Sequence, residues 1–149
     1  MAQSLLHNKQ MAVLYTASVN STGGRNGHVK SSDGKLDLAV QKPAEMQGNG
    51  EGTNPEQLFA AAYSACYGGV IKFVAGKQGI ELPEGFSIDA QISVNLEGAN
   101  MYLSGNLVVN LPGMEQERAE KLARTSYNAC MYTKAVKGNM EVELTVIGD

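Results

Sequence analysis

The segment TNPEQLFAAAYSACYGGVIKFVA, residues 53–75, predicts a long helix around which the rest of the chain folds. Thr53 and Glu56 have the spacing of a capping box, and Pro55 suits the first turn of a helix. Apolar residues lie on nearly every face of the segment, a pattern typical of a central buried helix. The same helix carries Cys66, one of only two cysteines in the chain.

The segments on either side of this helix predict strands and one further helix. The second helix is amphipathic, and an Asp33-Gly34 dipeptide indicates a hairpin between two short strands. The expected strands cover residues 12–19, 28–31, 36–40, 87–96, 101–111 and 140–147, and the second helix covers residues 115–130. This order predicts an α+β fold with antiparallel sheets wrapped around central buried helices.

Composition and charge limit the classes of function. The chain has 149 residues without an internal repeat, which predicts a single domain over residues 1–149 with a polar, loosely ordered arm at residues 1–10. A net charge of −3 and a pI of about 5.4 provide no electrostatic footprint for nucleic acid or an anionic membrane. The N-terminus lacks an export signal, so a reducing, cytoplasmic location is expected, where a transient disulfide is possible but a permanent one is not.

The apolar stretch of residues 58–75 is interrupted by Ser64, Gly68, Gly69 and Lys72, which favours a buried helix over a membrane span. A helix that is apolar on all sides needs more cover than a thin sheet and one amphipathic helix provide. We therefore expect an intertwined homodimer.

The two cysteines, Cys66 and Cys130, leave two interpretations open. If they do not meet, each is a small core residue with a raised pKa and no reactivity. If they meet, they can cycle between dithiol and disulfide, and a reactive Cys66 needs a fixed positive charge nearby.

The candidate for that charge is Arg25, within TGGRNG at residues 22–27. A buried arginine needs a carboxylate partner, and Glu56 is the candidate. On a straight helix Glu56 and Cys66 are about 15 Å apart. Arg25 could reach both only along the helix or if the helix bends; otherwise a second subunit supplies part of the site.

Other chemistries fit less well. The only histidines are His7 and His28, and a Cys–His hydrolase would need one of them against a cysteine. The chain has no Cys-x-x-Cys motif and no paired histidine spacing, which excludes an ordinary structural zinc site. No nucleotide, haem or flavin fingerprint is present, so we expect neither a cofactor nor a metal.

The run from Gly52 to Cys66, GTNPEQLFAAAYSAC, closely resembles the active-site helix of the organic hydroperoxide resistance proteins, in the osmotically inducible protein C superfamily. The N-terminal segments VLYTA (13–17), TGGRNG (22–27) and SDG (32–34) resemble the first strands of that family. The region around Cys130 and Tyr132 resembles its second cysteine region. The Gly-Gly-Arg motif favours the organic hydroperoxide resistance branch.

This resemblance implies thiol-dependent reduction of alkyl and fatty-acid hydroperoxides in a homodimer, with a dihydrolipoyl group on a partner protein as the dithiol reductant. It implies that Cys66 is the peroxidatic cysteine, Cys130 the resolving cysteine, Arg25 the thiolate-stabilising cation and Glu56 its carboxylate partner. The expected substrate pocket consists of Phe59, Tyr63, Phe73 and Tyr132.

Two residues depart from the family pattern. Met131 stands between Cys130 and Tyr132, where the family pattern Cys-Pro-Tyr has proline, and Lys134 is not the residue expected at its position. A redox-responsive binding or sensor protein, which uses the same disulfide without turnover, is the alternative function. An inert cysteine pair in a small-molecule carrier is a third interpretation.

Overall fold

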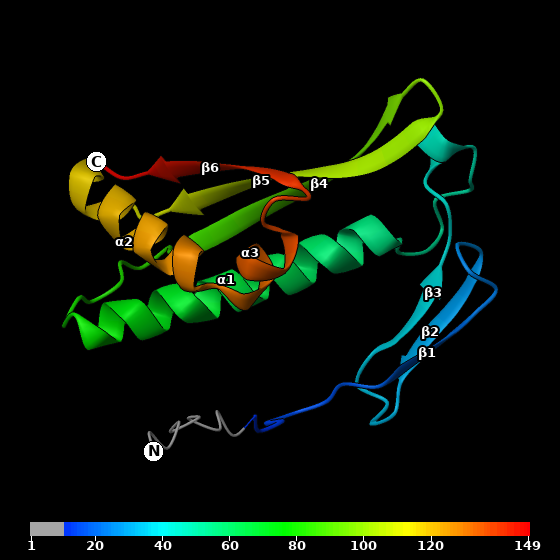
Figure 1. The fold of residues 1–149 in the computed structure, drawn as a ribbon, viewed down its shortest axis with the longest axis horizontal. Helices are drawn as coiled ribbons and strands as arrows, with labels where there is room; N and C mark the ends of the chain where they lie inside the picture. The colour runs from blue at the N-terminus through cyan, green and yellow to red at the C-terminus, as the bar shows by residue number, and fades with distance from the viewer. Residues whose placement is uncertain (1–10) are drawn as a thin grey trace, which may run out of the picture. The chain divides into compact units, whose positions relative to one another are not determined.

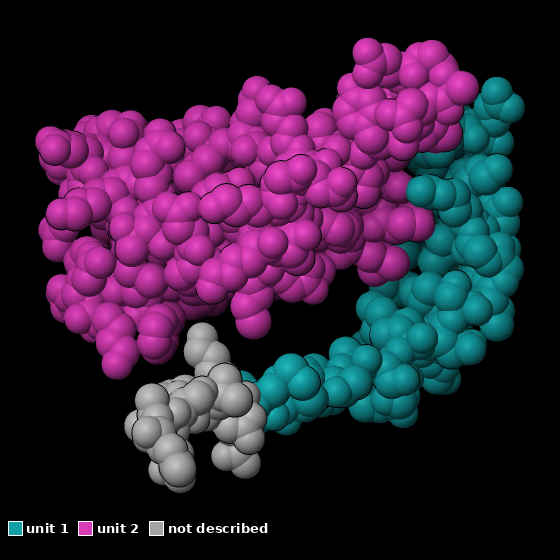
Figure 2. Space-filling model, in the orientation of Figure 1, with its two compact units in different colours: residues 1–53 teal, residues 54–149 magenta. Residues whose placement is uncertain are grey.

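The computed structural model describes residues 11–149, which form two compact units (Figure 2). The first unit ends at Thr53 and the second spans Asn54–Asp149. The predicted arm at residues 1–10 lies outside the described residues, and the single-domain organisation stays a prediction.

The first unit is a three-stranded antiparallel sheet in the order β1-β2-β3, with a short 3₁₀ helix after it (Figure 1). Its elements are β1 (Val19–Thr22), β2 (Gly27–Ser31), β3 (Asp37–Val40) and η1 (Ala44–Met46). The β2–β3 pairing confirms the hairpin predicted from Asp33-Gly34, and Gly34 has the positive φ that this turn requires, 73°.

The strand predicted at residues 12–19 is wrong, because β1 begins only at Val19. Val19 pairs with Ser31, the last residue of β2, so the residues before Val19 run past the end of their neighbouring strand. Alternation of apolar residues predicted a strand here, but a strand also needs a partner for its backbone. Val13, Leu14 and Tyr15 are 76%, 95% and 80% exposed.

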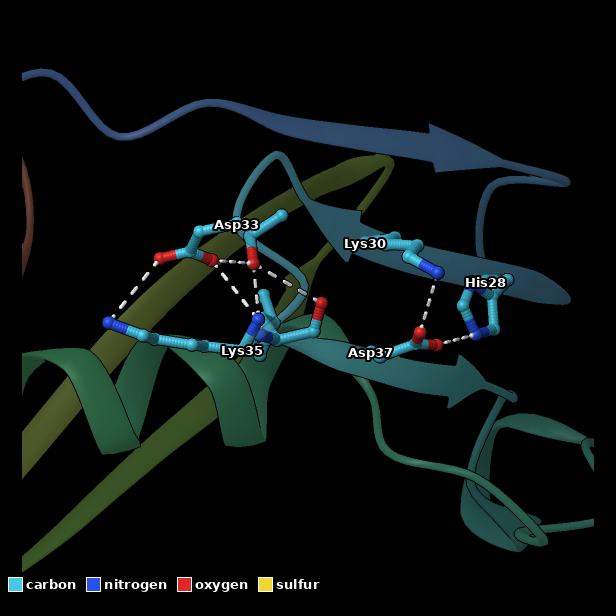
Figure 3. A network of polar contacts seen from close by, with 7 residues as sticks. His28, Lys30, Asp33, Lys35 and Asp37 are labelled. Carbon is cyan, nitrogen blue, oxygen red and sulfur yellow. Dashed lines mark hydrogen bonds and ion pairs between the residues drawn. The ribbon is translucent and has the colours of Figure 1, made fainter.

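A polar network on the first unit links β2 to β3 (Figure 3). His28 Nε2 and Lys30 Nζ lie 2.8 and 2.9 Å from the two carboxylate oxygens of Asp37. The hydrogen bond from Lys30 is the largest cause that lowers the pKa of Asp37. In the turn, Asp33 accepts hydrogen bonds from Ser31 Oγ and from the Lys35 N–H. These contacts are exposed and therefore add little to the free energy of folding, but they pair His28 with a carboxylate.

The second unit begins with helix α1 (Pro55–Lys77), whose first residue is the proline. The cap is Asn54, whose side chain accepts a hydrogen bond of 2.9 Å from the Gln57 N–H. The residue that caps the helix is therefore Asn54 and not the predicted Thr53. Pro55 forces the residue before it into an extended conformation, and Thr53 pairs with Val40 as an isolated bridge.

A three-stranded sheet in the order β4-β5-β6 follows, with two helices before its last strand (Figure 1). The elements are β4 (Ser87–Glu97), β5 (Asn100–Asn110), α2 (Gln116–Ala129), α3 (Met131–Val136) and β6 (Glu141–Ile147). β4 and β5 pair antiparallel around a turn that contains Gly98, but β5 and β6 pair in parallel. The α+β fold is confirmed, and antiparallel pairing holds for every described pair of strands except β5–β6, because α2 and α3 form a crossover that returns the chain in its original direction.

The core of the second unit lies between one face of the sheet and helices α1 and α2. A stripe on α1 at four-residue spacing is buried against residues of β5 and α2. The stripe is Tyr63, Tyr67, Ile71 and Ala75, and its buried partners include Leu107, Val109, Leu111, Ala119, Leu122 and Ala123. The fully buried Tyr67 hydroxyl donates a hydrogen bond of 2.7 Å to the Ala123 carbonyl, which joins α1 to α2.

The opposite face of α1 is exposed in the single chain, so one chain alone leaves the predicted central helix partly uncovered. Ala61, Ala65 and Gly69 are exposed, and Phe73 is 65% exposed. Among the described residues, α1 is the one helix long and apolar enough to cross a membrane, a property that the core helix of a soluble protein shares.

Candidate active site

The structure brings the two cysteines together. Cys66 lies in the middle of α1, Cys130 lies at the junction of α2 and α3, and their Sγ atoms are 4.0 Å apart. Both are free thiols; Cys130 is fully buried and Cys66 is partly exposed. A disulfide has a sulfur–sulfur length of about 2.05 Å, so closing the bond needs a movement of only about 2 Å. The interpretation in which the two cysteines do not meet is therefore wrong.

Cys130 is held from both sides by backbone hydrogen bonds. Its N–H donates to the Ser126 carbonyl at the end of α2, and its carbonyl accepts from the Lys134 N–H in α3, each at 3.0 Å. Its own backbone is extended, with φ −65° and ψ 130°, so it ends one helix and caps the next. Cys130 belongs to the buried core, as the amphipathic pattern of the second helix predicted, and its sulfur faces that of Cys66.

Burial raises the pKa of Cys66, and the adjacent Cys130 sulfur raises it further, because two thiols this close do not ionise independently. The backbone N–H groups of Tyr132 and Met131 oppose the shift by stabilising the thiolate. Met131 is the first residue of α3, a position whose N–H has no acceptor within the helix. Proline would fit this position, but it would lack the N–H donor.

Three aromatic rings lie beside the cysteine pair. Phe59 packs edge-on against Tyr63 and Tyr132, with ring centroids 6.2 and 6.5 Å apart, and Tyr63 lies 5.9 Å from Tyr132. The Tyr63 hydroxyl and the buried Thr133 Oγ1 form a hydrogen bond of 2.9 Å. Burial raises the pKa of Tyr63 to about 12, so this phenol is neutral at physiological pH.

These rings are three of the four residues expected to form the pocket, and the fourth, Phe73, has no described ring contact with them. Phe59 and Phe73 are each seven residues from Cys66 on α1, in opposite directions along the helix. The Phe73 ring is 5.6 Å from Lys77 Nζ at the end of that helix. Helical spacing put Phe59 and Phe73 on the same side of α1, but the described ring contacts of α3 reach only the Phe59 end.

Arg25 and Glu56 belong to different units. Arg25 lies in the turn between β1 and β2, where Gly23 and Gly24 have φ of 71° and 58°. Glu56 lies in the first turn of α1, which runs without a break to Cys66 and beyond. Their joint action on Cys66 stays a proposal. Within residues 11–149, no group of three or more His, Cys, Asp or Glu side chains could hold a metal ion.

Sequence reasoning missed helix α3 and with it Thr133. The signal that could have indicated α3 is Gly138, which follows the cap residue Lys137 with a φ of 79°. A glycine in this conformation commonly stops a helix. Because α3 supplies Tyr132, Thr133 and the Met131 N–H, it forms one wall of the site.

Comparison with known proteins shows a single family. The family model described as OsmC-like protein matches residues 48–145. The organic hydroperoxide resistance protein of Xanthomonas axonopodis pv. citri is 40% identical over 135 residues, which cover 90% of this chain and 95% of that relative. The organic hydroperoxide resistance protein OhrB of Bacillus subtilis is 40% identical over 133 residues, 88% of this chain and 96% of that relative.

A solved structure agrees with the sequence matches. The crystal structure of an organic hydroperoxide resistance protein OsmC from Legionella pneumophila superposes with a TM-score of 0.85 at 40% identity, over 91% of this chain and 98% of that one. The matches extend over both compact units and include both cysteine regions. The chain therefore belongs to the OsmC-like family, in its organic hydroperoxide resistance branch.

Proposed function

We propose that this protein reduces organic hydroperoxides to alcohols, with Cys66 as the attacking thiol and Cys130 as the resolving thiol. A role in organic hydroperoxide resistance follows from the names of its relatives. The observation that carries the thiol mechanism is the 4.0 Å separation of the two sulfur atoms. The partly exposed Cys66 and the fully buried Cys130 suit an attacking and a resolving role, respectively.

In the first step, the Cys66 thiolate attacks the terminal oxygen of the hydroperoxide. The O–O bond breaks, the alkoxide leaves and takes up a proton as the alcohol, and Cys66 becomes a sulfenic acid. The apolar rings beside Cys66 favour an alkyl or fatty-acid hydroperoxide over hydrogen peroxide, since each buried methylene contributes about 0.8 kcal/mol.

In the second step, the Cys130 sulfur attacks the Cys66 sulfenic sulfur, and water leaves as the disulfide forms. An external dithiol then reduces this disulfide to two thiols and is itself oxidised to a disulfide. We propose that the dithiol is a dihydrolipoyl group on a partner protein, which would reach the site along the aromatic rings. A reducing cytoplasm suits this cycle.

The attacking thiol needs a cation, because burial and Cys130 both raise the pKa of Cys66. We propose Arg25 as that cation and Glu56 as the carboxylate that orients it. Arginine keeps its charge in any surroundings and can also donate hydrogen bonds to the developing alkoxide.

Replacing Arg25 with alanine is expected to raise the pKa of Cys66, because the thiolate loses its counter-charge. The rate of alkylation by iodoacetamide, measured against pH, should reach its half-maximum at a higher pH than in the wild-type protein. Peroxidase activity at neutral pH should fall in parallel. The matched control is Arg118→Ala, which removes an exposed arginine at the start of α2. Coincident pH profiles for Arg25→Ala and the wild type would remove Arg25 from the site.

The exposed apolar surface of the single chain supports a homodimer. The small residues Ala61, Ala65 and Gly69 leave one face of α1 open to a second helix, beside a cleft of about 410 Å³ against β4. The exposed residues 11–15 add apolar surface in the first unit. A second copy of the chain would cover both. Sedimentation analysis at micromolar concentration should show a dimer, and a monomer would contradict the proposal.

The test of the proposed function is a steady-state assay with cumene hydroperoxide and dihydrolipoamide. A peroxidase consumes many equivalents of hydroperoxide per chain, whereas a redox-responsive binding protein stops after one equivalent. The rate of alkylation of the native protein tests the third interpretation, a small-molecule carrier with an inert cysteine pair. In such a carrier both cysteines would be alkylated slowly, whereas a peroxidase has a reactive Cys66.

A further inference from the structure

A buried hydrogen bond joins α3 to α1 about one helical turn away from the cysteine pair. The Tyr63 hydroxyl and Thr133 Oγ1 are 2.9 Å apart, and the two residues are 0% and 4% exposed. Tyr63 lies three residues before Cys66 on α1. Thr133 lies three residues after Cys130, in the first turn of α3. Because residues three positions apart in a helical turn are neighbours, the hydrogen bond and the sulfur pair are adjacent points of contact between the two helices.

The burial of this hydrogen bond makes it costly to break. Burial raises the pKa of Tyr63 to about 12, so the phenol keeps its proton at physiological pH and can act as donor or acceptor toward Thr133. A buried hydroxyl that loses its partner costs more free energy than the bond itself contributes. Movement of α3 away from α1 is therefore opposed at both hydroxyls.

The position of α3 determines where the Cys130 sulfur lies. The helix has six residues, and Cys130 is the residue that caps it. A helix of this length is not stable without contacts to its surroundings. Two such contacts meet at Tyr63, whose ring lies 5.9 Å from that of Tyr132 and whose hydroxyl bonds to Thr133. The sulfur atoms must approach from 4.0 Å to about 2.05 Å to form a disulfide, so a displacement of α3 would slow that step.

We propose that Tyr63 and Thr133 are positioning residues for the resolving step, because their hydrogen bond holds Cys130 within reach of Cys66. The two hydroxyls take no part in the transfer of oxygen or electrons and act through the placement of α3. Their role rests on the proposed peroxidase function and deepens it, since it concerns how fast the Cys66 sulfenic acid is resolved rather than how fast it forms.

Thr133→Val tests the proposal, because valine has nearly the shape of threonine without the hydroxyl. Two reactions compete for the Cys66 sulfenic acid when no external dithiol is present. Cys130 attacks its sulfur, and water leaves as the disulfide forms; or a second hydroperoxide oxidises it to sulfinic acid and leaves as an alcohol. Loss of a buried hydrogen bond weakens the attachment that it makes about tenfold. The concentration of cumene hydroperoxide that converts half of Cys66 to sulfinic acid, measured by mass spectrometry, should therefore fall about tenfold.

Three further variants separate positioning from a general loss of stability. Thr133→Ser keeps the hydroxyl and should retain the wild-type threshold for sulfinic acid, whereas Tyr63→Phe should lower it as Thr133→Val does. The matched control is Tyr67→Phe, which removes a buried phenol hydroxyl from the same helix. The Tyr67 hydroxyl bonds to the Ala123 carbonyl of α2, at 2.7 Å, so its loss should lower the urea midpoint but not the threshold. An unchanged threshold in Thr133→Val, or an equal fall in both phenylalanine variants, would overturn the positioning role.

The stability of the disulfide separates this proposal from the function on which it rests. Oxidised dithiothreitol takes two electrons and two protons from the Cys66 and Cys130 thiols and becomes the dithiol as the protein disulfide forms, without any hydroperoxide. The equilibrium constant for this exchange should be about tenfold smaller in Thr133→Val, which corresponds to a rise of about 30 mV in the reduction potential of the protein. Equal constants for Thr133→Val and the wild type would overturn the proposal. If the wild type reduces no hydroperoxide, the proposed function fails and this equilibrium alone decides the role of the hydrogen bond.

Discussion

Cys66→Ser is expected to lower the steady-state rate of cumene hydroperoxide reduction by a factor on the order of a thousand or more, as removal of an enzyme nucleophile does. A serine hydroxyl is not ionised near neutral pH and cannot pass through a sulfenic acid, so both the attack and the redox step are lost. The assay follows hydroperoxide loss with dihydrolipoamide in excess.

The substitution is small enough to separate chemistry from folding. Cys66 is partly exposed, so the hydroxyl of serine does not have to be buried without a partner. Urea denaturation should therefore give a midpoint close to that of the wild type. Ser64→Ala, two residues earlier on α1, is the matched control. The Ser64 hydroxyl bonds to the Ala60 carbonyl of its own helix, and its loss should leave the rate unchanged. Equal rates for Cys66→Ser and the wild type would end the peroxidase proposal.

Short-range sequence signals, such as a proline, a glycine turn or an apolar stripe, predicted several elements correctly. Pro55 marked the start of α1, Gly98 marked the β4–β5 turn, and the apolar stripe of α2 faces the core as expected. The cap residue was misassigned because two candidates, Thr53 and Asn54, stand side by side. Pro55 acts on the backbone of its immediate neighbour, and this effect decides between them.

Pairings between distant segments were less predictable. The alternation in β6 indicated a strand with one buried face, and the structure confirms it. Alternation is the same in parallel and antiparallel strands, so the pattern could not indicate that β6 runs parallel to β5. Residues 12–19 have the alternation typical of a strand, but the residues before Val19 lie beyond the end of β2, the strand with which they would pair.

The same limit applies to the candidate site: contacts between residues far apart in the sequence could not be predicted from local patterns. Spacing and apolar surroundings favoured inert core residues at Cys66 and Cys130, and only the resemblance to a family implied that they act together. Their meeting depends on the extended backbone at Cys130, which turns α2 into α3. This turn has no strong sequence signal before Gly138. The turn places α3, and therefore Tyr132 and Thr133, next to the two cysteines. Phe73 was expected in the pocket only because of its spacing from Cys66 on the helix.

Removing Cys130 is expected to separate the first chemical step from the second. Cys130→Ala should still consume about one equivalent of hydroperoxide per chain and release one alcohol, and then slow sharply. Without a thiol 4.0 Å away, the Cys66 sulfenic acid has no internal partner. It persists, or it reacts with a second hydroperoxide and becomes sulfinic acid, which the dithiol does not reduce.

The first step should not be slower in this variant, and the pKa of Cys66 explains why. The Cys130 sulfur is one of the causes that raise this pKa. Its removal should therefore lower the pKa of Cys66 and increase the thiolate fraction at neutral pH. Iodoacetamide should alkylate Cys66 in Cys130→Ala with a half-maximum at lower pH than in the wild type, the opposite of the change expected for Arg25→Ala.

Mass spectrometry after one equivalent of hydroperoxide decides the resolving role of Cys130. The wild type should contain an intramolecular disulfide, and Cys130→Ala should contain oxidised Cys66 without a disulfide. Alanine suits the fully buried position better than serine, whose hydroxyl would cost about 1–3 kcal/mol there without a partner. Sustained turnover by Cys130→Ala at the wild-type rate would mean that the external dithiol reduces the sulfenic acid directly. In that case Cys66 acts alone, and the 4.0 Å approach of the second sulfur serves packing rather than catalysis.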